Sequence, residues 1–234
     1  MCRSCASRGT KLLNPQCWKV LTFQQLRFHV NDRGTLTKVI RFYVDHSRGC
    51  ATTVVLPSNC TSKGLKYVAK GCPGLEYLCL LVDIRNKIKF NLAELVPSWQ
   101  HLECLALQHT PLYLGEILTQ ISLRCKDFSS LMLRGCIDDE EVLAIAIITP
   151  KIKVLNIKGS TLLGKNFKLI LQSCKELEYL DATKCIGFDE DDEEILKLAS
   201  HIKTSKFKGS MLYHCDNEWI GINDMDCPSD FGSD

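Results

Sequence analysis

The chain has 234 residues, of which 45% are hydrophobic and 24% are charged, an ordinary balance for a globular protein that buries a core without disulfides or metal. The formal net charge is only +2, from 29 basic and 27 acidic side chains, which argues against nucleic acid as the partner. No stretch approaches the ~18 apolar residues of a membrane span, and the first five residues lack the apolar segment of a secretory signal. We therefore expect a cytoplasmic or nuclear protein with no membrane association.

A spaced apolar pattern recurs along most of the chain: an apolar residue, a second one three residues later, and a third two residues after that. Successive copies begin 24, 27, 26, 24, 25 and 25 residues apart, within the roughly 20–29 residues of a leucine-rich repeat. The pattern predicts an α/β fold, a leucine-rich-repeat solenoid (horseshoe) of about six to seven strand–helix repeats. The copies are Ala51/Val54/Leu56, Leu75/Leu78/Leu80, Leu102/Leu105/Leu107, Phe128/Leu131/Leu133, Ile152/Leu155/Ile157, Leu177/Leu180/Ala182 and a degenerate Ile202/Ser205/Phe207.

Segments with helical periodicity lie between the expected strands, at residues 62–70, 113–123, 138–148, 165–172 and 192–200. Acidic and hydroxyl residues occur at several of their starts, where they complement the positive end of a helix dipole. A single strand–helix unit cannot bury its own leucines, so the units must stack to share a continuous core.

The fourteen cysteines follow the repeat. Cys72, Cys125 and Cys174 each stand three residues before an expected strand, and Cys136 and Cys185 each stand three residues after the last apolar strand position. Unpaired cysteine packs as a small buried hydrophobic residue, so we expect reduced, structural thiols. The one Cys-x-x-Cys pair, at residues 2 and 5, has no second pair at zinc-finger spacing, so no metal site is expected.

Two stretches resemble F-box/leucine-rich-repeat proteins, especially those of plants. One is the phrase Gly71-Cys72-Pro73-Gly74-Leu75-Glu76-Tyr77-Leu78, and the other is Cys2-Arg3-Ser4 followed by Asn14-Pro15-Gln16-Cys17-Trp18-Lys19-Val20-Leu21. The N-terminal stretch is similar to the last third of an F-box, although Cys5 stands where the family usually has Trp. The resemblance implies three regions: an F-box remnant at 1–20, a repeat domain at 21–210, and a C-terminal cap or flexible acidic tail at 211–234.

The resemblance further implies the substrate-recognition subunit of an SCF-type E3 ubiquitin ligase, which directs target proteins to ubiquitination and proteasomal degradation. Its partners would be a protein substrate, a Skp-family adaptor and a cullin. Cys2, Pro15 and Trp18 would be the remaining adaptor-binding residues. Because only the last part of the F-box matches, the alternative is a leucine-rich-repeat adaptor or inhibitor with no ligase link.

The outward-facing strand residues are the expected binding surface, because they line the concave face of a repeat horseshoe. For any single one of them, a merely solvated strand residue is the competing interpretation. The protein-binding residues predicted on this face are Tyr77, Leu81, Gln108, Met132, Arg134, Asn156, Lys158, Tyr179 and Asp181.

No enzyme is predicted. None of the six histidines forms a recognised pair with a Ser or Cys nucleophile, and no glycine loop for phosphate is present, so no catalytic or cofactor-binding residue is expected. The acidic run at residues 189–194 lacks the alternation and the central glycine of a calcium loop. It is expected to cap the helix that begins near Asp192.

Overall fold

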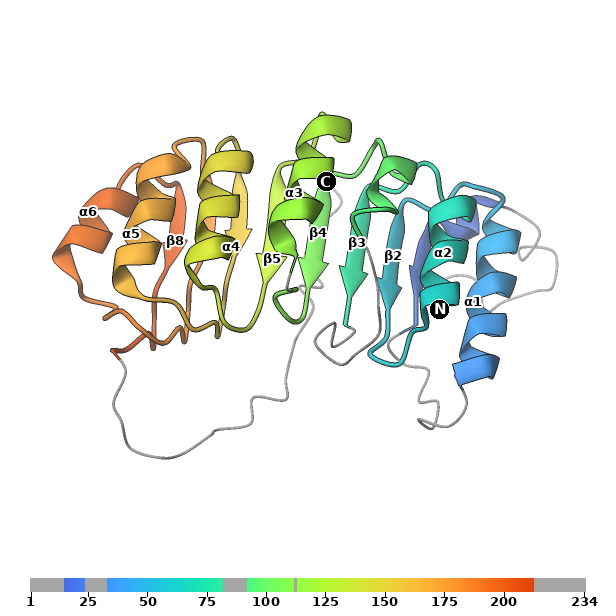
Figure 1. The fold of residues 1–234 in the computed structure, drawn as a ribbon, viewed down its shortest axis with the longest axis horizontal. Helices are drawn as coiled ribbons and strands as arrows, with labels where there is room; N and C mark the ends of the chain where they lie inside the picture. Colours follow the sequence, from blue (N-terminus) through green and yellow to red (C-terminus); the bar gives the residue numbers. More distant parts are fainter. Residues whose placement is uncertain (1–14, 24–32, 82–91, 112, 213–234) are drawn as a thin grey trace.

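The computed structural model describes residues 15–23, 33–81, 92–111 and 113–212. Eight parallel strands form one open sheet whose order follows the chain from β1 to β8 (Figure 1). All seven strands predicted from the apolar pattern are present, and β1 precedes them. The strands are β1 Val20–Thr22, β2 Thr53–Leu56, β3 Tyr77–Leu80, β4 Cys104–Leu107, β5 Ser130–Leu133, β6 Val154–Asn156, β7 Tyr179–Asp181 and β8 Thr204–Lys206.

The helices cover one face of this sheet (Figure 1). Each predicted helical segment is found, with ends shifted by at most one residue, and the helix after β5 continues from an α-helix into a π-helical turn. The helices are η3 Pro15–Trp18, α1 Arg33–Ser47, α2 Ser62–Gly71, η4 Val96–Ser98, α3 Leu114–Arg124, α4 Asp139–Leu143, η5 Ala144–Ile148, α5 Gly164–Ser173 and α6 Glu193–Ala199.

The first unit, β1 with α1, was not predicted as a repeat. Trp18, Leu21 and Phe23 have the same apolar spacing as the other copies, but Trp18 stands 33 residues before Ala51, outside the usual period. In the structure Leu21 and Phe23 are buried with one face of α1 against the shared core. The repeat architecture therefore begins at Val20.

The unit between β3 and β4 has the thinnest helical layer among the described residues. Its helix, η4, is three residues long, whereas the neighbouring α2 and α3 have 10 and 11 residues. Trp99 follows η4 and is fully buried, together with Leu92 and Val96. A large aromatic side chain thus fills the space that helix residues fill elsewhere.

The repeat cysteines take two structural positions. Cys72, Cys125 and Cys174 cap the C-termini of α2, α3 and α5, where their backbone N–H groups donate to the last helical turn, and all three are buried. Burial raises the pKa of the Cys72 thiol to about 12 and that of Cys174 to about 11. The ten cysteines in the described ranges form no disulfide.

In three units the residue three positions after the strand pattern links neighbouring repeats. The Cys185 thiol donates to the last core residue of the preceding strand pattern, Ile157, at 3.1 Å. The hydroxyls of Ser160 and Ser210 do the same for their own preceding strands. Cys136 differs from the expectation of a buried thiol. It is exposed, because Ile137, the next residue, fills the core position.

Candidate protein-binding surface

The sheet face without helices, here called the concave face, is built from three columns of side chains that run across the strands. The parallel register fixes these columns, because each residue pairs with its equivalent in the next strand. The first column is Val20, Thr53, Tyr77, Cys104, Ser130, Val154, Tyr179 and Thr204, and the second is Thr22, Val55, Cys79, Ala106, Met132, Asn156, Asp181 and Lys206. The third follows the strands and includes Leu81, Gln108, Arg134, Lys158, Thr183 and Lys208.

The columns divide the concave face into an apolar end and a polar end. Between β2 and β5 the second column is Val55, Cys79, Ala106 and Met132, which with Cys104 form an apolar cluster separate from the main core. From β6 onward the same column is Asn156, Asp181 and Lys206. The side chains of the second column therefore change from apolar to polar between β5 and β6.

The predicted residues at the apolar end are Tyr77, Leu81, Gln108 and Met132. Tyr77 and Leu81 are half-buried and pack against the apolar cluster, and Gln108 is half-buried beside it. Met132 lies on this face as expected, but only 7% of its surface is exposed. Its neighbours in adjacent strands cover it from the sides, so Tyr77 and Leu81 are the more accessible apolar groups.

At the polar end, side chains organise the turns that follow the strands. The Asn156 side-chain oxygen accepts the Lys158 backbone N–H at 3.0 Å. In the next repeat, Asp181 accepts both the backbone N–H and the hydroxyl of Thr183, at 3.1 and 2.8 Å. Asp181 is only 8% exposed, so its carboxylate shapes the turn more than it faces solvent.

Cations dominate the rest of the polar end. Lys206 Nζ lies 3.0 Å from the Tyr179 hydroxyl oxygen and 5.1 Å from the centre of its ring. The hydrogen bond to Tyr179, and to a smaller extent the Asp181 carboxylate, raise the pKa of Lys206. Arg134 is half-buried and Lys158 is exposed at the turns after β5 and β6. The structure therefore brings seven of the nine predicted residues to accessible positions on one face.

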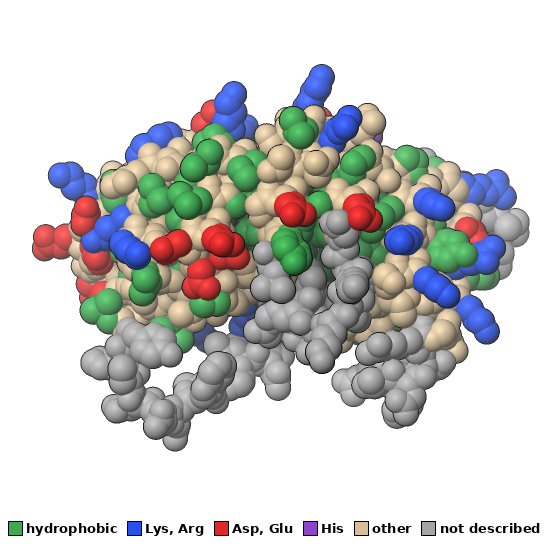
Figure 2. All heavy atoms as spheres, viewed as in Figure 1, with side chains coloured by type: hydrophobic (Ala, Val, Ile, Leu, Met, Phe, Trp, Pro, Cys, Tyr) green, Lys and Arg blue, Asp and Glu red, His purple; other side chains and the backbone are tan. Residues whose placement is uncertain are grey.

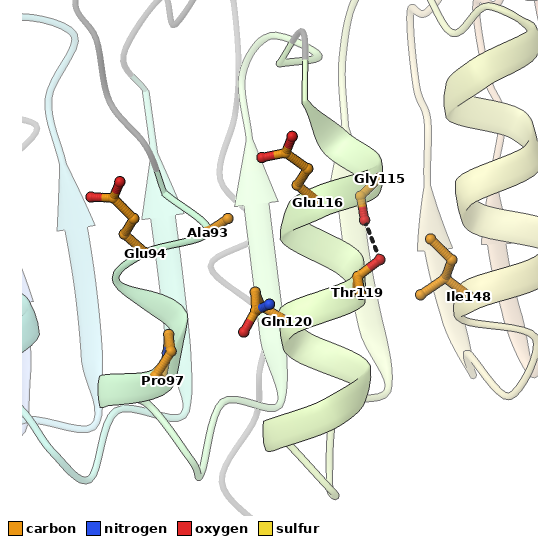
Figure 3. A pocket seen from close by; sticks show the side chains of 8 residues that line it. All are labelled: Ala93, Glu94, Pro97, Gly115, Glu116, Thr119, Gln120 and Ile148. Atoms are coloured by element: carbon orange, nitrogen blue, oxygen red, sulfur yellow. Dashed lines mark hydrogen bonds between the residues drawn. The ribbon is translucent and has the colours of Figure 1, made fainter.

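A second hollow lies on the helical face, between η4 and α3 (Figure 3). It has a volume of about 620 Å³ and lies where the described helical layer is thinnest. Glu94 and Glu116 lie on its two sides, and the Thr119 hydroxyl donates to the Gly115 carbonyl at 2.7 Å. The apolar pattern of the sequence did not predict this hollow. Two sequence features could have indicated it: the 27-residue interval between Leu75 and Leu102, and the absence of a helical pattern between these two residues.

Hydrophobic side chains also gather on the helical face over α4 and α5 (Figure 2). Ile147 is 70% exposed and Leu143 is 47% exposed, one helical turn apart. Within the described ranges, no group of three or more His, Cys, Asp or Glu side chains is placed to hold a metal ion. In the same ranges, no helix has both the length and the apolar character needed to cross a bilayer.

Known proteins with sequences similar to this chain include F-box proteins of plants. No protein-family model matches the chain. The chain is 24% identical to F-box/LRR-repeat protein 23 of Arabidopsis thaliana over 227 residues, which cover 93% of the chain and 45% of that protein. It is 22% identical to F-box protein FBW2 of the same species over an alignment of 240 positions, which covers 99% of the chain and 74% of that protein.

The chain is therefore similar, at low identity, to an F-box/LRR-repeat protein and to an F-box protein. It spans less than half the length of the first of these F-box/LRR relatives. Among solved structures, an internalin (InlF) of Listeria monocytogenes is similar with a TM-score of 0.44 and 13% identity, over 71% of this chain and 50% of that one. That score is too low to establish a shared fold. The solenoid assignment rests on the repeat period and the strand register.

Three N-terminal residues, Cys2, Pro15 and Trp18, are predicted to bind an adaptor. Cys2 lies outside the described residues. Pro15 begins η3, which leads into the first strand as the resemblance implies. Trp18 is half-buried and packs edge-on against Tyr43, with ring centres 5.3 Å apart, and against His46 at 5.6 Å. Its indole therefore packs on α1 within the first repeat.

Proposed function

We propose that the chain is a protein-interaction module that selects target proteins for an SCF-type E3 ubiquitin ligase, and so for proteasomal degradation. One observation carries the binding part of the proposal. Eight strands in unbroken parallel register present a single continuous face with accessible aromatic, aliphatic and cationic side chains. Aromatic residues and arginine are favoured anchors in protein interfaces. The F-box/LRR relatives support the ligase part. We also propose that the protein acts in the cytoplasm or nucleus.

The ligase link requires a Skp-family adaptor and a cullin. Interface energy is concentrated in a few central residues. The stretch that resembles an F-box is the region of Cys2, Pro15 and Trp18, and Trp18 already packs inside the first repeat. We therefore expect the 234-residue chain to bind an adaptor weakly, and the same chain preceded by the F-box start of a relative to bind it tightly.

The test is a calorimetric titration of a purified Skp-family adaptor into both forms. Tight binding by the extended form, followed by recruitment of the cullin, would support the ligase role. Absence of binding by either form would refute it. A Trp18→Phe variant keeps most of the aromatic packing on Tyr43, so it separates loss of the adaptor contact from loss of the first repeat.

The alternative function is an adaptor or inhibitor that binds the same proteins without a ligase. The inward packing of Trp18 favours it, because that indole is committed to Tyr43 and His46. In that role the chain should compete with a ligase-bound receptor for a shared target, and added chain should slow ubiquitination of that target in a reconstituted reaction.

A further inference from the structure

We propose that the concave face binds an extended segment of a partner protein in which an apolar anchor is followed or preceded, at a fixed distance, by a group of carboxylates. The anchor would contact the apolar end between β3 and β5, and the carboxylates would contact the cations after β5 to β8. This deepens the proposed function, because it specifies the chemistry of the target that the concave face selects.

The cations of the polar end form a row along the turns that follow the strands. Arg134, Lys158 and Lys208 occupy the third column, and Lys184 stands beside it in the turn after β7. The side chains of these four residues form no hydrogen bond or ion pair with the described part of the chain. We call them the cationic row.

The row differs from the cations at the opposite end of the strands. There, Glu178 lies between Lys153 and Lys203, with oxygen–nitrogen distances of 3.8 and 2.6 Å, so both lysines are paired with a carboxylate that offsets part of their charge. Beside the cationic row, the Asp181 carboxylate is buried and occupied by Thr183, and Glu190 accepts the Gly209 backbone N–H. Among the residues that the structure describes, the row therefore keeps an uncompensated positive charge.

The backbone holds part of the row in place. In the turn position after the third column, Gly135, Gly159 and Gly209 have positive φ values of +120°, +68° and +77°. The Arg134 guanidinium lies against Gly159, where an added Cβ would come within 3.3 Å of it. The arginine thus extends along the row toward the next repeat, which brings its charge closer to Lys158 and Lys184.

Strand spacing sets the dimensions of the bound segment. Adjacent strands lie about 4.8 Å apart, so the row from β5 to β8 spans about 14 Å, and the distance from β3 to β8 is about 24 Å. An extended chain rises about 3.3 Å per residue. Two or three carboxylates within about four or five residues would match the row, and an apolar residue about three or four residues away would reach Tyr77 and Leu81.

The experiment is a fluorescence-anisotropy titration of the full chain with labelled synthetic peptides of about ten residues. The probe peptide carries a Trp-Leu anchor, a short Gly-Ser spacer and a run of Asp and Glu. One control peptide replaces the acids with Asn and Gln, and another replaces the anchor with Ser. We expect the probe to bind at least about tenfold more tightly than either control at low salt, and the acidic contribution to fall at high salt because ions screen exposed charges.

Protein variants locate the binding. Arg134→Glu with Lys158→Glu should weaken probe binding by about tenfold or more. The matched control is Lys66→Glu with Lys126→Glu, which changes the net charge equally at exposed lysines outside the row and should change affinity less than about twofold. Leu81→Ser should weaken binding of the probe peptide and should leave binding of the peptide without the anchor unchanged. Thermal melts of each variant exclude loss of folding.

Three results would overturn the proposal: unchanged affinity in the Arg134 and Lys158 variant, equal binding of the acid-free peptide, or self-association of the chain that blocks the probe and assigns the face to a second copy. The titration contains no adaptor. A failure here would leave the ligase test unaffected, and a failure of the ligase test would leave the peptide result standing.

Discussion

Lys184 occupies a turn position that is glycine in three other repeats. It has a φ of +56°, in the same turn position that glycine occupies at Gly135, Gly159 and Gly209. The left-handed region is strained for residues with a Cβ and is open to glycine. The turn is thus formed by the surrounding repeats in spite of this residue.

Lys184→Gly should therefore raise the free energy of unfolding by about 0.5–1 kcal/mol. The matched control is Lys158→Gly, at a position outside the left-handed region, where the added backbone freedom should lower stability instead. Urea titration of both variants checks the signs. A destabilised Lys184→Gly variant would mean that the lysine side chain itself supports the turn.

The buried thiols give the protein a dependence on alkaline pH. Burial raises the pKa of Cys60, Cys72 and Cys185 from the ordinary value of 9.0 to about 12. Between these values the unfolded thiols ionise while the folded thiols keep their protons, so the folded state binds more protons and stability falls as the pH rises. Below pH 9 this contribution is fully present.

We expect the free energy of unfolding to fall from about pH 9 to 12, by up to about 1.4 kcal/mol per pH unit for each such thiol. Replacing Cys60 and Cys72 by Ala should make the decline shallower, even though it lowers stability at neutral pH. Chemical denaturation at several pH values measures both effects. Parallel curves for the two proteins would show that the thiols do not cause the decline.

At the scale of the element, strands β3 to β7 contribute inward leucines whose position the repeat period predicts. Leu131 of β5 and Leu155 of β6 are completely buried, whereas Leu143 of α4 is 47% exposed. Truncating a buried leucine removes its burial and leaves a cavity, so Leu131→Ala or Leu155→Ala should cost about 2–5 kcal/mol. Leu143→Ala is the control and should cost less than about 1 kcal/mol. Equal effects in denaturant melts would show that the core assignment is wrong.

The elements that sequence predicted are those whose cores repeat. Strands β2 to β8 and the five helical segments follow from apolar spacing alone, because every unit must bury equivalent positions against its neighbours. The β1–α1 unit was missed because its interval is too long. The hollow beside η4 was missed because Trp99 replaces a helical stripe, and a single aromatic residue has no periodicity to detect.

The concave face could be predicted as a set of positions but not as a set of accessible groups. Strand alternation assigns Met132 and Asp181 to that face, and the structure places both there. Their burial depends on lateral neighbours in adjacent strands and on the hydrogen bonds from Thr183, which spacing does not reveal. The contribution of Lys184 to the cationic row was missed for a related reason, because turn residues lie outside the apolar pattern.

At the scale of the whole molecule, stability depends on contacts between adjacent repeats, because a repeat touches only its neighbours. Among the described residues the helical layer is thinnest at η4, so we expect coupling between the units on its two sides to rely largely on the β3–β4 ladder and on Trp99. Trp99 is fully buried, and within the described ranges its indole N–H is the single buried side-chain polar atom without a hydrogen-bond partner.

Trp99→Ala should lower the free energy of unfolding by about 3–5 kcal/mol, the usual cost of removing a buried tryptophan. It should also uncouple the repeats that precede η4 from those that follow it. We expect the single unfolding transition to separate into two, with a calorimetric enthalpy larger than the van't Hoff enthalpy. Trp99→Phe keeps most of the ring and removes the unpaired N–H, so it should retain one transition. Trp18→Ala, at the half-buried edge of the first repeat, should also lower stability without splitting it. One sharp transition in Trp99→Ala, shifted to lower temperature, would instead show that the four paired residues of β3 and β4 are enough to couple the repeats.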